Sequence, residues 1–142
     1  MVIRTKEILI NGLIAGVIIS ISALTMVPVV GNEMDSVLVN RGLPPLSNAA
    51  MAYFCCISLV FGISIIFLYT VLKPQFGSWV KTAVIASIIV WVLAYLINNV
   101  SLAVYGFMPV RLAIIGSIWG LLELLLASII ASRLYDKRIK VT

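Results

Sequence analysis

The chain of 142 residues contains no histidine, two cysteines and only 11% charged residues. Without histidine it lacks the commonest general base and metal ligand, and the usual axial ligand of haem. Cys55 and Cys56 are adjacent, so on a helix their side chains point about 100° apart. That arrangement suits neither a disulfide nor a Cys-x-x-Cys redox site, and we expect two small packing residues. Phosphate loops, nucleophile elbows and zinc motifs are also missing. We therefore expect neither a metal site nor an enzyme that acts alone.

Apolar residues dominate what is present. They make up 63% of the chain, and the mean hydropathy is +1.20, whereas a soluble domain is about half apolar and a quarter charged. A bilayer core of ~30 Å takes ~20 helical residues, and helices satisfy every backbone amide without water. Four runs are long enough: residues 8–30, 49–72, 82–103 and 112–134. The sequence predicts an all-α integral membrane protein, a single domain over residues 1–142 that forms a four-helix bundle.

The positions of the charges predict the topology. The net charge is +5, and eight basic residues fall on one side of the predicted membrane: Arg4, Lys6, Lys73, Lys81, Arg133, Lys137, Arg138 and Lys140. Arg41 and Arg111 fall on the other side. Because basic residues stay inside, we expect both termini in the cytoplasm and loop 31–48 on the outer face of the inner membrane. The first run exceeds the ~7–15 apolar residues of a signal peptide, so we expect it to be retained.

The loops carry few features. Loop 31–48 has three apolar residues at helical spacing, which predict a short amphipathic surface helix: Met34, Val37 and Leu38. Ser47 or Asn48 is expected to cap the second span. Pro74 and Gly77 are expected to break the helix before the third span. The outer loop is either a lid, a docking surface or a plain connector.

Small residues four apart form stripes along three spans. Lipid tails are as apolar as leucine, so membrane helices associate through close backbone approach at such stripes, and residues four apart share a helix face. The stripes are Gly12, Gly16 and Ser20; Ser58 and Gly62; Gly116 and Gly120; Ala127 and Ala131; Ser128 and Ser132. Tight packing is expected, either within the chain or between chains.

Glu123 is the notable residue, because an ionisable group in the middle of an apolar run is costly and usually functional. It follows Gly120 by three residues and therefore shares a face with Gly116 and Gly120. At 1.5 Å per residue, Ser20 and Glu123 lie ~18 Å and ~16 Å from the cytoplasmic end of their spans. We predict that the first and fourth spans pack through their glycine faces and that Ser20 hydrogen-bonds Glu123. Alternative partners are Ser64 and Tyr95.

Several roles for Glu123 remain open. No basic residue lies at its depth, so the neutral acid is expected. Such an acid either joins two helices, carries a proton or binds a cation, or ligates a pigment or metal in a larger assembly. A dry helix contact would favour assembly, and a polar cavity beside the carboxyl would favour transport.

Several segments resemble a loose group of bacterial hypothetical proteins with four predicted spans and about this length. They are Gly42-Leu-Pro-Pro-Leu-Ser-Asn-Ala-Ala-Met51, Lys73-Pro-Gln-Phe-Gly77, Trp91-Val-Leu-Ala-Tyr95 and Trp119-Gly-Leu-Leu-Glu123-Leu-Leu-Leu-Ala-Ser128. The resemblance implies a bacterial membrane location. The group has no assigned activity, so the resemblance implies no function.

Three functions fit the sequence. The leading expectation is an accessory or structural subunit of a larger membrane complex, or a homo-oligomer, without catalysis of its own. The alternatives are a small oligomeric proton or cation transporter or channel that uses Glu123, and a protein that binds lipid or another hydrophobic molecule. The expected partners are lipids and other membrane subunits or copies of the chain. Nucleic acid is not expected, because a basic face with exposed aromatic residues is missing. A pigment or lipid cofactor is expected only within a larger complex.

Overall fold

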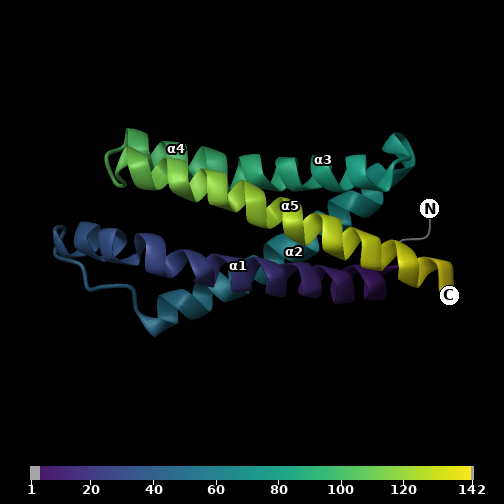
Figure 1. Cartoon of the computed structure of the whole chain (residues 1–142), viewed down its shortest axis with the longest axis horizontal. Helices are drawn as coiled ribbons and strands as arrows, with labels where there is room; N and C mark the ends of the chain where they lie inside the picture. Colours follow the sequence, from purple (N-terminus) through teal and green to yellow (C-terminus); the bar gives the residue numbers. More distant parts are fainter. Residues whose placement is uncertain (1–3, 142) are drawn as a thin grey trace.

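The computed structural model of the protein describes residues 4–141, and the side chains of residues 4–139. Over this range it consists of helices joined by short connections (Figure 1). The elements are α1 (Thr5–Val39), α2 (Asn48–Phe76), α3 (Trp79–Trp91), the π-helical segment η1 (Val92–Leu96), α4 (Ile97–Val104) and α5 (Val110–Val141). α3, η1 and α4 form one continuous span, so four helices are long and apolar enough to cross a membrane. Four helices of the chain thus have the length and hydropathy of membrane spans, as the sequence predicts.

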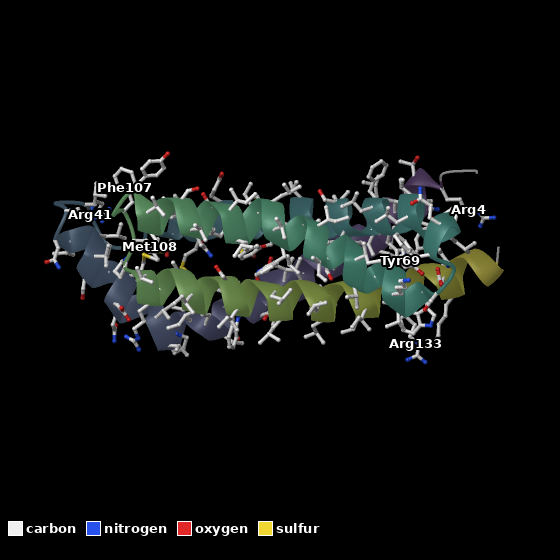
Figure 2. All side chains as sticks on the ribbon, turned by 90° about the horizontal axis from the view of Figure 1, so that it is seen from above. Arg4, Arg41, Tyr69, Phe107, Met108 and Arg133 are labelled. Atoms are coloured by element: carbon white, nitrogen blue, oxygen red, sulfur yellow. The ribbon has the colours of Figure 1, made fainter. Side chains whose placement is uncertain are left out.

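The four spans lie lengthwise beside one another, and both termini lie at the same end of the bundle (Figure 1). We call this end, which also carries the α2–α3 turn, the terminal end. The opposite end, with loop 40–47 and the α4–α5 turn, is the loop end. Figure 2 shows Arg4 and Arg133 at the terminal end and Arg41 at the loop end. The predicted separation of the basic residues between the two ends is therefore confirmed.

α1 is longer than expected and runs without a break through Pro28 to Val39. The predicted separate amphipathic helix around Met34 is therefore wrong, because these residues continue the first span. Gly31 keeps a helical backbone, and the chain turns only at Gly42, where φ is +69°. A positive φ is accessible to glycine at little cost, so Gly42 and not Gly31 marks the end of the span.

The ends of α2 agree better with the sequence. The side chain of Ser47 accepts a hydrogen bond of 3.2 Å from the backbone N–H of Ala50, so the predicted cap is confirmed. Pro74, expected to break the helix, lies within its last turn. The helix ends at Gly77, where φ is +66°. The helix thus continues for two residues beyond Pro74, which is exposed in its last turn.

The closest contact in the bundle joins α1 to α2. A Cβ atom added to Gly16 would lie 2.5 Å from the Cα of Leu59 and 2.9 Å from the carbonyl oxygen of Ser58. A Cβ atom on Gly62 would overlap the backbone of Gly12 and Gly16. The glycine face of α1 is thus covered by α2. The expected packing of the first span on the fourth through these stripes is wrong, since the small residues Ser58 and Gly62 make α2 the better match.

The terminal half of the bundle is a tightly packed core. Its members have no exposed surface in the structure: Ala15, Ile19, Ile65, Ile66, Ala83, Ala86, Leu124, Ala127 and Ala131. α5 contributes its stripe of Ala127 and Ala131 here. Beside it, the Ser128 hydroxyl donates a hydrogen bond of 2.7 Å to the Ala83 carbonyl of α3. Small side chains therefore bring all four spans together in this half.

The close contact between α1 and α2 can be tested by filling it. We expect Gly62→Val to lower the free energy of unfolding by about 3 kcal/mol, because the added methyl groups overpack a contact between two backbones. Unfolding of the purified protein in detergent micelles measures the loss. Gly31→Ala is the control variant. Its added Cβ atom would have one neighbouring side chain within 4 Å, that of Val27 at 3.5 Å. That variant is expected to keep its stability or gain up to about 1 kcal/mol from helix propensity. Equal stability of Gly62→Val and wild type would contradict the packing described.

Candidate functional site

The wide turn of η1 places the first residue of the site. The N–H of Ile97 bonds to the carbonyl of Val92, five residues back, in place of the usual four. Such π-helical turns occur often at functional sites. Tyr95 lies in this turn, and its ring covers Gly120 of α5 so closely that any Cβ atom on Gly120 would overlap the ring. The glycine therefore makes room for the tyrosine.

The third span packs against the glycine face of α5, which Gly116 and Gly120 form. One turn from Gly120, a Cβ atom on Gly116 would lie 3.3 Å from Nδ2 of Asn99 in α4. Gly116 and Gly120 thus accommodate Asn99 and Tyr95, and not the glycines of α1. Sequence spacing correctly placed Glu123 on this face, but it assigned the face to the wrong neighbour.

Glu123 is 3% exposed, and its Oε1 accepts a hydrogen bond from the hydroxyl of Tyr95. Its other oxygen, Oε2, is buried and has no hydrogen-bond partner within residues 4–139. The predicted bond from Ser20 is wrong, because Ser20 follows the glycine face of α1 that α2 covers. The alternative partner Tyr95 is confirmed. Ser64, the other alternative, donates to the carbonyl of Val60 in its own helix, at 2.8 Å.

A cavity of about 240 Å³ lies beside Glu123, between all four spans. It reaches from the loop end, where Met34, Phe54 and Met108 line it, to Tyr95 and Glu123 near mid-span. The rest of the wall is mostly apolar and aromatic, with contributions from Met26, Phe61, Leu112 and Trp119. The carboxyl of Glu123 is therefore the acidic group at the inner end of a largely apolar cavity.

Most polar groups of this wall are already engaged with the protein. The hydroxyl of Ser58 donates to the Phe54 carbonyl at 2.9 Å, and Nδ2 of Asn99 donates to the Ser117 hydroxyl at 3.1 Å. Among the buried lining oxygens in the described part of the chain, Oε2 of Glu123 is the one left without a partner. Since buried polar atoms are nearly always hydrogen-bonded, this oxygen indicates a place for a ligand, a proton or water.

The packed core closes the cavity toward the terminal end. On α1, α2 and α5 a fully buried residue lies one turn of four residues beyond the last lining residue: Ile19 after Ala23, Ile65 after Phe61, and Ala127 after Glu123. On the third span the corresponding residue is Val90, five residues from Tyr95 because of the π-helical turn. Glu123 is thus closed off toward the terminal end.

A second polar cluster lies beyond this core at the terminal end. Lys73 of α2 pairs with Asp136 of α5, and Arg138 of α5 lies 3.8 Å from the carboxylate of Glu7 in α1. Asn11 is fully buried beside them and donates a hydrogen bond of 2.7 Å to the Glu7 carbonyl. Sequence reasoning missed this cluster. The residue that could have indicated it in the sequence is Asn11, a polar amide inside the first apolar run.

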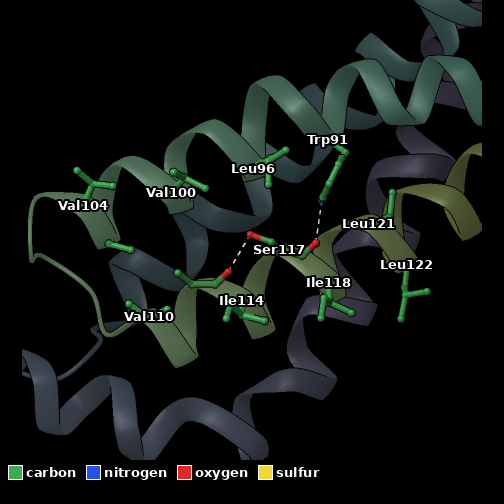
Figure 3. Close-up of a pocket in the computed structure, with 12 residues that line it drawn as sticks. Trp91, Leu96, Val100, Val104, Val110, Ile114, Ser117, Ile118, Leu121 and Leu122 are labelled. Carbon is green, nitrogen blue, oxygen red and sulfur yellow. Dashed lines mark hydrogen bonds between the residues drawn. The ribbon is translucent and has the colours of Figure 1, made fainter.

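A larger hollow has a different character. It measures about 630 Å³ and lies on the surface between α4 and α5, lined by Val100, Ile114 and similar side chains (Figure 3). Trp91 donates to the Ser117 carbonyl at 2.8 Å, and the Ser117 hydroxyl donates to the Ala113 carbonyl at 2.8 Å. Through these bonds, the polar groups of Trp91 and Ser117 in the groove wall find partners within the protein. This groove suits an acyl chain or apolar side chains.

Comparison with known protein families, with curated proteins and with solved structures gives no match. The resemblance seen in the sequence therefore stays a prediction. No group of three or more His, Cys, Asp or Glu gathers within the described residues in a way that would hold a metal ion. What the cavity offers a ligand is one carboxyl oxygen, the Tyr95 hydroxyl beside it and a wall of aromatic and methionine side chains.

The hydrogen bond between Tyr95 and Glu123 can be tested with a double-mutant cycle. Combining Tyr95→Phe with Glu123→Leu is expected to give a coupling free energy of about 1–3 kcal/mol, because either single change leaves a buried polar partner unsatisfied. Unfolding in detergent measures the four stabilities. Tyr53 lies 63% exposed on α2, so Tyr53→Phe is the control and should be additive with Glu123→Leu. Additivity for Tyr95 would show that the two side chains do not interact.

Proposed function

We propose that the protein is a small membrane carrier that takes up a proton or a cation at Glu123. The observation that supports this proposal is the unpartnered oxygen of a buried carboxyl at the inner end of a cavity between four spans. A carboxyl that served only to join two helices would lie in a dry, packed contact. Glu123 has a packed contact on one side, with Tyr95, and a cavity on the other.

The charge distribution supports a direction for the uptake. Basic residues concentrate on the cytoplasmic side of membrane proteins, so we place the terminal end in the cytoplasm and the loop end on the outer face of the inner membrane. In this orientation the cavity faces outward and the packed core blocks it from the cytoplasm. The arrangement is that of an outward-facing carrier.

Release to the cytoplasm requires the terminal end to open. Two ion pairs hold this end together, Lys73–Asp136 between α2 and α5 and Arg138–Glu7 between α5 and α1. At the loop end, Arg111 of α5 lies 2.6 Å from Glu33 of α1 with 73% of the arginine side chain exposed. Exposed pairs contribute about 0–1 kcal/mol, so loss of the Arg111–Glu33 pair costs little stability. The pairs of both ends are formed together in this structure, and release to the cytoplasm would require the two at the terminal end to break.

Proton flux tests the carrier directly. Proteoliposomes with the wild-type chain should acidify under an imposed proton gradient faster than protein-free vesicles, as a pH-sensitive dye inside them reports. Glu123→Gln keeps the shape of the side chain but cannot exchange a proton, so its flux should fall to the protein-free level. Asp35 lies outside the cavity wall and accepts a hydrogen bond from the Leu46 N–H, which an asparagine would keep. Asp35→Asn should therefore keep the wild-type flux. Undiminished flux in Glu123→Gln would contradict the proposal.

The proposed topology has its own test. In a Cys55→Ser, Cys56→Ser background, Arg41→Cys at the loop end should react with a membrane-impermeant maleimide in intact cells. Lys81→Cys in the α2–α3 turn should react only after the membrane is permeabilised. The reverse pattern would place the cavity mouth on the cytoplasmic side.

The accessory or self-assembling subunit is the second candidate. It is favoured by the apolar groove between α4 and α5, whose side chains Ile114, Ile118 and Leu122 are each more than half exposed. A neighbouring helix or a lipid chain would fill this groove. The flux experiment separates the two candidates, because an accessory subunit has no need of an exchangeable proton at Glu123.

A further inference from the structure

The wall of the Glu123 cavity has an unusual composition. Four aromatic side chains line it, and three of the five methionines of the chain do so as well. The aromatic residues are Phe54, Phe61, Tyr95 and Trp119, and the methionines are Met26, Met34 and Met108. Aromatic faces attract cations, most strongly where water is excluded. Methionine side chains adapt to ligands of varied shape.

The charges of the cavity favour a cationic ligand. No lysine or arginine is among the lining residues, and Glu123 is the acidic residue among them. An anion would therefore meet a carboxyl without any compensating positive charge. A cation would pair with the unpartnered Oε2 of Glu123.

The wall also discriminates between kinds of cation. Ca²⁺ and Mg²⁺ need about six or more oxygen ligands, or keep several bound waters. This cavity offers few oxygens, and those of Ser58 and Tyr95 already make hydrogen bonds within the protein. An apolar wall cannot replace the water lost from a small inorganic ion. It suits an organic cation, whose charge is spread over carbon-bound groups and is only weakly hydrated.

The volume limits the size of such a ligand. Pockets for drug-sized molecules measure roughly 300–1,000 Å³, and this cavity measures about 240 Å³.

We propose, resting on the carrier function above, that the cavity binds a small lipophilic organic cation. The ligand is an amine or quaternary ammonium with one ring or a few short alkyl groups. Its charged group lies between Glu123 and the ring of Phe61, whose centroid is 5.8 Å from that of Tyr95. Its apolar part contacts Trp119 toward the loop end.

Benzyltrimethylammonium is a suitable probe, because its carbon isostere neopentylbenzene has the same shape without the charge. Isothermal titration calorimetry of the full chain in detergent should show saturable binding of the cation and much weaker binding of the isostere. Glu123→Gln should weaken the binding of the cation at least about tenfold, because the buried charge loses its counter-charge. The isostere should be unaffected by that change.

A matched pair of variants on α2 tests the aromatic wall. Phe61 lines the cavity, whereas Phe67 lies outside the wall and is 47% exposed. Phe61→Leu should weaken binding of the cation about threefold, as expected for loss of one cation–π contact, and Phe67→Leu should leave it unchanged. This pair keeps the test decisive should Glu123→Gln fail to fold, which circular dichroism would reveal.

The outcomes separate the inference from the function on which it rests. Equal binding of cation and isostere, insensitive to Glu123→Gln, would make the cavity a site for neutral hydrophobic molecules and overturn the inference. Absence of organic-cation binding together with proton flux that depends on Glu123 would overturn the inference and leave the carrier in place. Absence of both would overturn both.

Discussion

The approach of α1 to α2 at Gly12, Gly16 and Gly62 is the contact on which the rest of the bundle depends. In lipid, the hydrophobic effect does not drive helices together, so association requires close van der Waals contact. Glycine permits backbones to touch in the terminal half, and the small residues of α3 and α5 complete the core there. In the loop half, larger side chains such as Phe54 and Trp119 line the cavity between the same spans. The tight core and the cavity thus coincide with smaller and larger side chains along the same four helices.

Glu123 lies at the boundary between these two halves. A carboxyl at this depth is expensive, and Tyr95 satisfies only one of its oxygens. By contrast, Trp91 and Ser117 in the apolar groove find partners within the protein. A few other buried side-chain atoms of the described residues also lack a partner, among them Oδ1 of Asn11 and Oγ of Ser132. The unpartnered oxygen of Glu123 differs from these because it belongs to a residue of the cavity wall, where a bound ligand would supply the missing partner.

Hydropathy and charge were sufficient to predict the four spans and the end of the bundle to which each basic residue belongs. Periodicity was sufficient to place Glu123 on the face of Gly116 and Gly120. Neither pattern identifies which neighbouring helix covers a given face, so α1 was assigned to the glycines of α5. The length of α1 was also underestimated, because Pro28 and Gly31 are compatible with a helix when the surrounding chain continues it.

The partner of Glu123 was the hardest feature to predict. Its position depends on η1, and residues 92–96 contain no proline or glycine that would signal an irregular turn. In a regular α-helix Tyr95 would be rotated away from its observed direction, and the spacing to Val90 would be four residues instead of five. Such a change in winding arises from tertiary packing, here the space above Gly120, and leaves no local signature.

The π-helical turn η1 determines the site but not the packing of the helices around it. A π-helical turn contains one residue more than an α-helical turn, so α3 and α4 keep the faces they would have if that residue were missing. Loss of a single residue between Val92 and Leu96 would restore a regular helix and preserve the packing on either side, while withdrawing the tyrosine from the carboxyl. In evolutionary terms, a bundle of this kind can gain or lose its polar centre through a one-residue insertion or deletion, without rebuilding the helices around it.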